Sequence, residues 1–228
     1  MNKKLIIWDW NGTLLNDVEA CVQAMNIMLT KRNRKLIEAK LYKDIFTFPV
    51  KKYYEILGFD FNQESFEELS VEYIDLYKKL SRKSPLHESV IETLDFFKAK
   101  NYRQIILSAS EQLALDKQAK ERGVFYYFDA IIGLDNIYAK SKLDNALKFI
   151  KNSQVDFEQI VFIGDTYHDY EVAKAIGAEC ILIQLGHQNL ERFDLEGKAH
   201  IVKDFLELKE LFNSKKPLIA NNINVGNS

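Results

Sequence analysis

Acidic, amide and hydroxyl side chains gather directly after the first apolar stretch of the chain. Residues 4–8 are apolar enough to form a buried strand, and they lead into Asp9, Asn11, Gly12 and Thr13. Burying a carboxylate without a partner is costly, so an acid at the end of such a strand usually faces a metal ion, a cation or a group of N–H donors. We therefore interpret Asp9 as the chemical centre of the protein.

Three later segments carry polar groups that suit the same chemistry. Residues 108–110, Ser-Ala-Ser, offer small hydroxyls for an anionic oxygen, and we expect their N–H groups to open a helix. Residues 139–142, Ala-Lys-Ser-Lys, supply an ammonium group that would balance a phosphate or a carboxylate. Asp165 and Asp169 are one helical turn apart, and together with Asp9 they would repel one another unless a divalent cation lay among them.

The elements that position these groups follow from the hydrophobic pattern. The predicted strands are residues 4–8, 103–107, 130–132, 159–163, 180–184 and 200–202. The predicted helices between and after them are residues 88–99, 111–122, 142–151, 170–175 and 205–212. Repeated strand–helix units predict an α/β fold with a parallel, doubly wound sheet, whose ligands bind beyond the carboxyl ends of the strands. The four polar segments would then meet at one edge of the sheet.

The segment between the first strand and residue 85 has only a helical period. Apolar residues recur at three- and four-residue spacing from Val18 to Leu29, and further helices are predicted at residues 35–46, 50–57 and 65–80. The sequence therefore predicts three parts. They are an α/β core of residues 1–15 and 83–214, a small all-helical cap of residues 16–82, and a flexible tail of residues 215–228.

Composition excludes several classes of protein. With 228 residues, 47% of them hydrophobic and 28% charged, the chain is an ordinary globular protein. A net charge of -2 with interspersed signs argues against nucleic-acid binding. No apolar run approaches the roughly 20 residues of a membrane span, and no signal-peptide pattern precedes the first strand, so we expect a cytoplasmic protein with no membrane partner. Cys21 and Cys180 are expected to be buried free thiols.

The order of these motifs resembles the haloacid dehalogenase-like hydrolase superfamily. The resemblance rests on Asp-x-x-Gly-Thr at residue 9, a serine after an apolar strand, a lysine, and Gly-Asp-x-x-x-Asp at residue 164. It covers nearly the whole chain, and the helical cap lies where the phosphoglycolate-phosphatase-like branch has one. The resemblance implies a Rossmann-like core and Mg²⁺-dependent hydrolysis of a small phosphorylated metabolite through an aspartyl-phosphate. We expect a monomer or a weak homodimer.

Residue by residue, the resemblance implies a nucleophile and a magnesium site. Asp9 would form the aspartyl-phosphate. Magnesium would be held by Asp9, by the backbone carbonyl of Asn11 and by Asp165. Asp169 would be a further ligand or an acid behind the ligands, although both acids could also simply cap the start of a helix.

The groups that would hold the phosphoryl are Ser108 and Lys142, which the resemblance implies, with further contacts from Gly12, Thr13, Asn11 and Ala109. Gly12 would let the backbone approach the phosphate, and Thr13 would anchor the loop through a side-chain to backbone hydrogen bond. Lys142 competes with Lys140 for the role of the phosphate lysine. From the cap, Lys51 could contact an anionic substrate, although a solvent-exposed helix start explains it equally well.

One residue departs from the pattern of the family. Phosphatases of this family have a second aspartate two residues after the nucleophile, which protonates the leaving group and then activates water, and this chain has Asn11 there. Losing a general acid/base costs on the order of 100- to 10,000-fold in rate. Asp17, His168 and His187 are candidates to replace the missing general acid/base. If Asn11 limits the rate, Asn11→Asp should raise turnover by about tenfold or more.

Two other functions therefore stay open. The first is a non-catalytic or very slow phospholigand-binding protein on the same fold. The second is a haloacid dehalogenase, although the paired acids Asp165 and Asp169 favour a metal ion that halide displacement does not need. A receiver domain would also use Asp and Lys, but it has no place for the helical insertion.

Overall fold

A computed structural model of the chain describes residues 5–134, 142–153 and 159–214. Six strands form one parallel sheet in the order β3-β2-β1-β4-β5-β6. The strands are β1 (Leu5–Trp8), β2 (Arg103–Glu111), β3 (Ala130–Leu134), β4 (Ile160–Gly164), β5 (Glu179–Ile183) and β6 (His200–Val202). The predicted doubly wound α/β fold is confirmed, and β1 lies in the interior of the sheet between β2 and β4.

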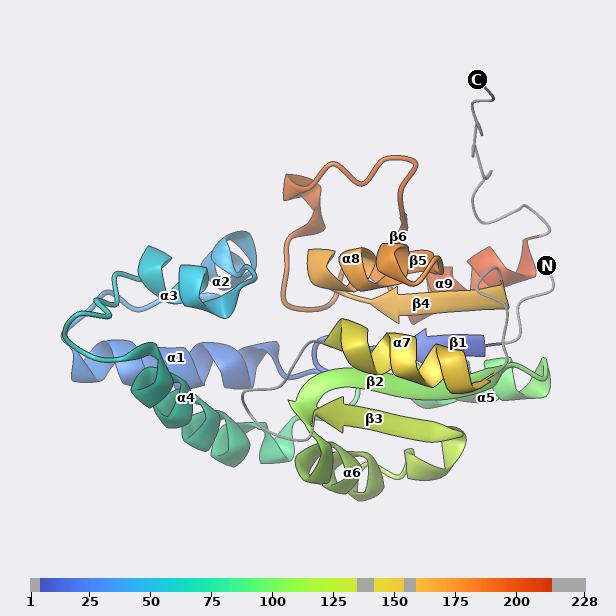
Figure 1. The fold of residues 1–228 in the computed structure, drawn as a ribbon, viewed down its shortest axis with the longest axis horizontal. Helices are drawn as coiled ribbons and strands as arrows, with labels where there is room; N and C mark the ends of the chain where they lie inside the picture. The colour runs from blue at the N-terminus through green and yellow to red at the C-terminus, as the bar shows by residue number, and fades with distance from the viewer. Residues whose placement is uncertain (1–4, 135–141, 154–158, 215–228) are drawn as a thin grey trace.

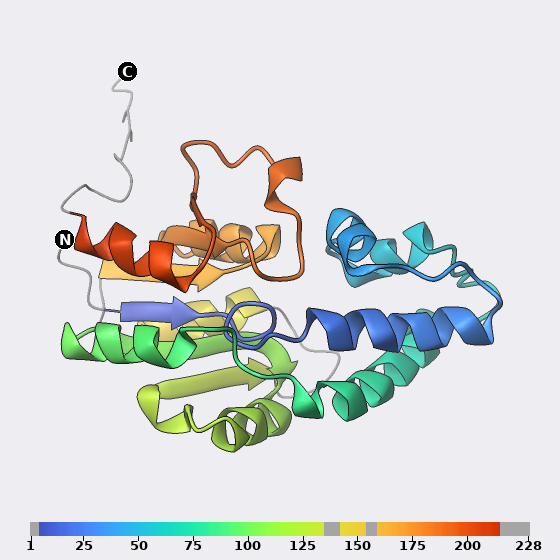
Figure 2. The ribbon, with the colours of Figure 1, turned by 180° about the vertical axis from the view of Figure 1, so that it is seen from behind.

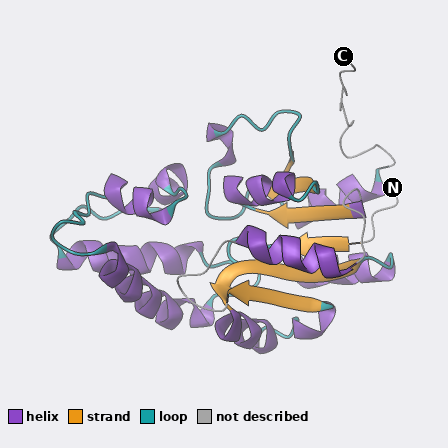
Figure 3. Cartoon of the chain, viewed as in Figure 1, coloured by secondary structure: helices purple, strands orange, loops and turns teal. Residues whose placement is uncertain are grey.

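Helices cover both faces of this sheet (Figure 3). They are α5 (Val90–Ala99), α6 (Gln112–Glu121), α7 (Lys142–Ser153), α8 (Tyr167–Ala175) and α9 (Phe205–Asn213), with 3₁₀ turns η2 (Phe125–Tyr127) and η4 (Leu190–Arg192). Alternate residues of a strand point to opposite faces. Ile6 and Trp8 accordingly pack in one core cluster with α5, α6 and α9, and Leu5 and Ile7 in another with α7 and α8. Figure 2 shows α5 and α9 covering the face of the sheet that is turned away from the viewer in Figure 1.

A separate group of helices lies beyond the carboxyl ends of the strands (Figure 1). It consists of α1 (Val18–Lys31), α2 (Ala39–Ile45), α3 (Val50–Ile56) and α4 (Phe66–Leu80), and η1 (Ser81–Lys83) leads from it back to the sheet. We call residues 18–80 the helical unit. It has a hydrophobic cluster of its own, in which Met25, Tyr54 and Leu69 are buried. This cluster is separate from the two core clusters on the faces of the sheet.

Two predicted elements differ from the observed ones for identifiable reasons. Helix α2 begins at Ala39 rather than at residue 35, because Asn26 exchanges two hydrogen bonds with the backbone of Ile37 and holds that residue outside the helix (2.8 and 2.9 Å). Helix α8 begins at Tyr167 rather than at residue 170, because the Thr166 hydroxyl caps it by accepting from the Asp169 N–H.

The prediction that residues 108–110 open a helix is wrong. Strand β2 continues through them to Glu111, with a register shift against β3 between Leu107 and Glu111, and α6 begins only at Gln112. A bulge of this kind redirects side chains near the end of a strand. The serine hydroxyls therefore reach the site from an irregular strand end and not from a helix N-terminus.

Other expectations have simple outcomes. Cys21 and Cys180 are free and buried, as predicted. Among the residues described, no helix has the length and apolar character needed to cross a membrane. The predicted tail, residues 215–228, lies outside the described residues.

The aromatic core under β1 provides a test of the fold. Phe97 is fully buried, and its ring lies 5.7 Å from that of Trp8 and 4.7 Å from that of Phe212. We expect Phe97→Ala to lower the free energy of unfolding by about 3–5 kcal/mol, because it removes buried area and leaves a cavity. The neighbouring, half-buried Phe96 is the matched control, and Phe96→Ala should cost clearly less in urea unfolding. Equal losses would contradict this account of the core.

Candidate active site

Three buried carboxylates meet where β1 and β4 end. Asp9 follows β1, Asp165 follows β4, and Asp169 lies in the first turn of α8. Carboxylate oxygens of the three lie within 4.8 Å of one another. Lys142, the first residue of α7, places its Nζ against Asp9 Oδ1 and 2.6 Å from Asp169 Oδ1. The predicted meeting of these four groups is therefore observed, and a single ammonium faces three acids.

The protonation of these acids reflects that imbalance. Burial raises the pKa of Asp9 to about 8; the Lys142 ammonium opposes this shift, and Asp169 and Asp165 add to it. Burial also raises the pKa of Asp165 to about 6. For Asp169, burial works in the same direction, but Lys142 and the Thr166 hydrogen bonds outweigh it and hold the pKa below its usual range. The cluster is short of positive charge at Asp9 and Asp165.

The donor atoms fit a divalent cation. Magnesium takes oxygen ligands and is usually held through one or two carboxylates. Among the described residues, the hydrogen-bond contact of Asp9 Oδ2 is a long one with the Thr13 hydroxyl, 3.4 Å, so this oxygen has lone pairs to offer. Asp169 is more heavily used, because its Oδ2 accepts from the Asp165 N–H, the Thr166 N–H and the Thr166 hydroxyl at 2.7–3.2 Å. Asp9 is therefore the best placed of the three as a ligand. Both Asp165 oxygens accept hydrogen bonds, from Thr13 and the His187 N–H, and Asp169 holds Lys142.

The loop after β1 closes tightly over Asp165. The Thr13 hydroxyl donates to Asp165 Oδ1 at 2.8 Å. We predicted a hydrogen bond from this hydroxyl to the backbone, but it anchors the loop to a carboxylate instead. Gly12 has φ +75°, and a Cβ there would lie 2.5 Å from Asp165 Oδ2. At Gly186, a Cβ would lie 2.0 Å from the same oxygen. Glycine is needed at both positions because backbone packs directly against the acid.

The Asn11 side chain is held on both sides. Its Nδ2 donates to Asp17 Oδ2 at 2.8 Å and to the Tyr77 hydroxyl at 2.6 Å. Its Oδ1 accepts from the Ser110 hydroxyl at 2.6 Å, and the Ser108 hydroxyl lies 3.5 Å away. The amide thus links the bulged end of β2 to helix α4 of the helical unit. A carboxylate at position 11 would lose both donors and would face the Asp17 carboxylate.

Asp17 and His187 form a buried ion pair next to Asn11. His187 Nε2 lies 3.3 Å from Asp17 Oδ1, and its Nδ1 lies 3.0 Å from the Tyr42 hydroxyl. Asp17 also accepts from the Gly12 N–H at 2.8 Å and from the Tyr77 hydroxyl at 2.6 Å. Burial alone would lower the pKa of His187, but the Asp17 charge outweighs it and raises the pKa to about 9. Burial opposes ionisation of Asp17 too, and His187 nevertheless holds its pKa below the usual range.

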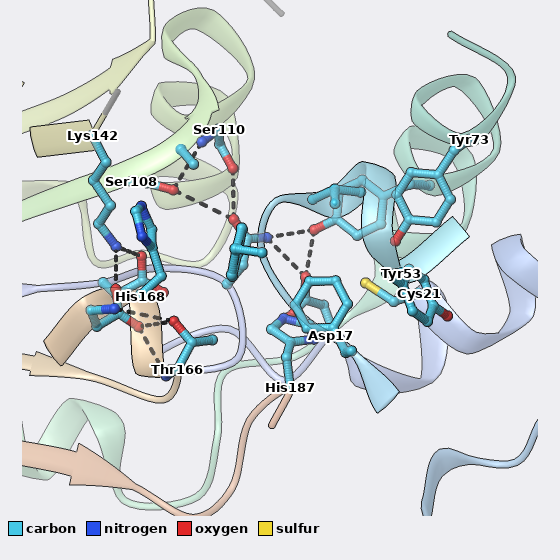
Figure 4. Close-up of a pocket in the computed structure, with 18 of the residues that line it drawn as sticks. Asp17, Cys21, Tyr53, Tyr73, Ser108, Ser110, Lys142, Thr166, His168 and His187 are labelled. Atoms are coloured by element: carbon cyan, nitrogen blue, oxygen red, sulfur yellow. Dashed lines mark hydrogen bonds and ion pairs between the residues drawn. The ribbon is translucent and has the colours of Figure 1, made fainter. Parts of the chain in front are cut away.

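These groups surround one cavity of about 260 Å³ (Figure 4). The predicted site residues that line it are Asp9, Asn11, Ser108, Ala109, Lys142 and Asp169. Thr13 and Asp165 are buried behind this lining, and the Gly12 backbone packs against Asp165. Figure 4 shows Lys142 and Ser108 on the side of the sheet, with Tyr53, Tyr73 and Cys21 on the side of the helical unit.

Two lysines of the sequence prediction are not brought to this cavity. Lys51 is exposed and is not part of the cavity lining, and its ammonium lies 4.9 Å from the centre of the Phe61 ring. Lys140 lies outside the described residues, so the structure places only its competitor Lys142. His168, a candidate acid, lines the cavity at its rim, with its ring 4.9 Å from that of Phe48.

Several groups of the site had no clear signal in the sequence. Tyr77 belongs to an apolar helical stripe, and its hydroxyl meets Asn11 across 66 positions of chain. Tyr42 likewise had no signal beyond its place in the predicted helix 35–46, and its hydroxyl contacts His187 Nδ1. Buried His87 contacts the Gly12 carbonyl oxygen through Nε2 at 3.0 Å. The hydroxyls of tyrosines in amphipathic helices are the one sequence feature that could have suggested polar contacts there.

Comparison with known proteins identifies the family. A family model described as haloacid dehalogenase-like hydrolase matches residues 6–183. The chain belongs to the haloacid dehalogenase-like hydrolases. A phosphoglycolate phosphatase from Pseudomonas savastanoi pv. phaseolicola is 22% identical over 215 residues, covering 90% of this chain and 78% of the relative. The pyrophosphatase PpaX of Bacillus velezensis is 23% identical over 218 residues, covering 89% and 94%.

Solved structures of the family share the fold. A haloacid dehalogenase-like hydrolase from Streptococcus pneumoniae aligns with a TM-score of 0.79 at 21% identity, covering 92% of this chain and 99% of that one. A predicted phosphoglycolate phosphatase from Haemophilus somnus aligns with a TM-score of 0.74 at 18% identity, covering 93% and 99%. These relatives support placement of this family member in the phosphoglycolate-phosphatase-like branch.

The contact between Asn11 and Asp17 changes what Asn11→Asp should do. The single substitution opposes two buried carboxylates, so we expect it to lower the free energy of unfolding by about 1–3 kcal/mol and not to raise turnover by itself. The exchange variant Asn11→Asp/Asp17→Asn restores an amide opposite a carboxylate. It should recover most of the lost stability in urea unfolding. Additive effects of the two substitutions would contradict a direct coupling.

The Asp17–His187 pair predicts a pH dependence of stability. Folded His187 keeps its proton up to about pH 9, whereas an unfolded histidine releases it near 6.5. The stabilisation is therefore complete below pH 6.5 and is lost as the pH rises toward 9. We expect the free energy of unfolding, measured with EDTA present, to fall over this range, and to fall less steeply in His187→Gln. His168→Gln is the matched control, and an unchanged slope in His187→Gln would refute the assignment.

Proposed function

We propose that the protein is a magnesium-dependent phosphatase that hydrolyses a small phosphorylated metabolite through an aspartyl-phosphate on Asp9. The observation that carries this proposal is the position of Asp9 in the cavity wall, between Lys142 and a cluster of carboxylates. Phosphoryl transfer needs a nucleophile and groups that balance the charge of the transferring phosphoryl, and the site offers both. Membership of the haloacid dehalogenase-like hydrolases and the phosphatase relatives support it.

The proposed chemistry has two steps. A carboxylate oxygen of Asp9 attacks phosphorus, and the ester P–O bond breaks to release the alcohol part of the substrate. Water then attacks the aspartyl-phosphate, which frees inorganic phosphate and restores Asp9. Lys142 and the Ser108 hydroxyl, both of which line the cavity, would hold phosphoryl oxygens.

A magnesium ion would fit the acids beside Asp9. Asp9, Asp165 and the Asn11 carbonyl would hold it, with Asp169 behind them. Bound there, it would balance the charge of the phosphoryl oxygens.

The leaving group also needs a proton, which Asn11 does not supply. Asp17 and His187 line the same cavity as Asp9 and are joined to each other, so we propose this pair as the proton source. His168 lies at the rim, against Phe48.

We further propose that residues 16–82 act as a cap over the cavity. The last turn of α2 and the residues after it contact the loop that follows β5. Gln188 Nε2 donates to the Phe46 carbonyl at 3.0 Å, and Asn189 Nδ2 donates to Asp44 Oδ1 at 2.9 Å. These bonds hold aromatic residues of the helical unit over the carboxylates. A closed cap would keep bulk water away from the phosphoryl group.

A second candidate function is binding of a phosphorylated ligand without turnover. The observation that favours it is the Asn11 amide, which cannot exchange a proton and is held by hydrogen bonds on both sides. The two functions differ in one measurement, the release of inorganic phosphate.

Phosphate release from p-nitrophenyl phosphate tests the proposal. We expect turnover with Mg²⁺, none with EDTA, and a loss of at least about 1,000-fold in Asp9→Asn, because the nucleophile is gone. Asp75→Asn, an exposed site on α4, is the matched control and should keep full activity. If the wild-type protein shows no turnover but binds phosphate in calorimetry only with Mg²⁺, the binding protein is the better description. Turnover that survives EDTA would refute magnesium dependence.

A further inference from the structure

The cavity has two chemically different halves. The half next to the sheet carries the carboxylates, Lys142 and the serine hydroxyls, and it would take the phosphate. The half formed by the helical unit is mainly aromatic and aliphatic. Its lining includes Tyr42, Phe46, Val50, Tyr53, Tyr54 and Tyr73. The alcohol part of a phosphate ester would lie in this second half.

Cations for a second anionic group are lacking in the described part of the lining. Its basic residues are Lys142, His168 and His187. Lys142 is taken by Asp9 and Asp169, and His187 by Asp17. His168 lies at the rim, between Phe48 and Glu171. Among the described residues, a carboxylate or a second phosphate buried among the tyrosines would therefore meet no free positive charge, which is costly.

One buried polar atom in this half has no partner. Tyr53 lines the cavity with an exposed fraction of 2%, and its hydroxyl makes no hydrogen bond with any described residue. Buried polar groups are nearly always satisfied by protein or by ordered water, so this hydroxyl is available to bond a ligand in the cavity. A hydroxyl is neutral, so it suits a neutral hydrogen-bonding group and does not replace a cation.

The size of the cavity limits the ligand as well. An apolar cavity of about 150 Å³ is enough to hold benzene. The volume of about 260 Å³ therefore leaves room for a phosphoryl group and an alcohol of about one ring.

From these observations we infer that the substrate is a phosphate monoester whose alcohol part is uncharged, mainly apolar and about as large as one aromatic ring. This inference rests on the proposed phosphatase function and narrows its substrate class. It excludes substrates such as phosphoglycolate and pyrophosphate, which carry a second anionic group. Two relatives are named for these substrates.

Two primary alkyl esters test the inference in the assay. Benzyl phosphate and 2-phosphoglycolate differ mainly in the ring and the carboxylate, so differences in leaving-group chemistry are small. We expect kcat/KM to be at least about tenfold higher for benzyl phosphate. A preference for 2-phosphoglycolate would overturn the inference and leave the phosphatase function standing.

Binding of phosphonates keeps the test independent of turnover. Benzylphosphonate and phosphonoacetate present the same contrast and cannot be hydrolysed. Calorimetry in Mg²⁺ should show benzylphosphonate binding at least about tenfold more tightly. If no ester is turned over, p-nitrophenyl phosphate included, the phosphatase function fails while this binding comparison still decides which ligand class the cavity takes. Equal or tighter binding of phosphonoacetate overturns the inference.

A charge placed in the aromatic half should weaken or abolish the preference. Val50, the first residue of α3, lines the cavity and is only partly buried. Val50→Lys should reduce the benzylphosphonate preference by about tenfold or more, because the ammonium can pair with the carboxylate. Val50→Met has a similar length without the charge and should keep the wild-type ratio. The same reduction in both variants would show that charge is not what selects the ligand.

Discussion

Lys142 lies between two of three buried carboxylates, and the arrangement of the site depends on that contact. Its ammonium bonds Asp9 and Asp169, which come from different segments of the sheet edge. Among the described residues, Asp165 accepts hydrogen bonds from the Thr13 hydroxyl and the His187 N–H, and neither of these donors carries a charge. Because burial makes this excess of negative charge costly, the site favours a divalent cation over an empty state. Under the proposed function, the metal ion, the nucleophile Asp9 and the phosphate lysine Lys142 would form one electrostatic unit.

Asn11, which departs from the family pattern, is in contact with a nearby acid, Asp17. The position two residues after the nucleophile is an amide, and an acid lies instead at Asp17, within 2.8 Å of that amide. Asp17 in turn pairs with His187, which joins the loop after β5 to the loop after β1. One amide and one carboxylate are therefore in contact at this point. These residues also tie the helical unit to the sheet, since the Tyr77 hydroxyl bonds Asn11 and the Tyr42 hydroxyl contacts His187.

The sheet and the helical unit contribute differently to the cavity. The edge of the parallel sheet supplies charge and hydroxyls, which suit any phosphate ester. The helical unit supplies tyrosine, phenylalanine and valine side chains, which distinguish one ester from another by charge and size. Under the proposed function, reaction type and substrate choice would reside in different parts of the chain. Relatives at 22% and 23% identity are named for two different substrates, phosphoglycolate and pyrophosphate.

The sequence by itself determined which residues meet at the sheet edge. Asp9 and Asp165 could be placed together because each directly follows an apolar strand, and parallel strands bring such positions to one edge. Ser108 was expected at the same edge but lies inside β2, and Lys142 was one of two candidate lysines. Only the tertiary structure decided what surrounds them. The partners of Asn11 lie 6, 66 and 99 positions away, on elements whose relative placement no local pattern encodes. Lys51 and Tyr53 sit near each other in α3, yet one faces solvent and the other the cavity, because packing of the helical unit fixes which face turns inward.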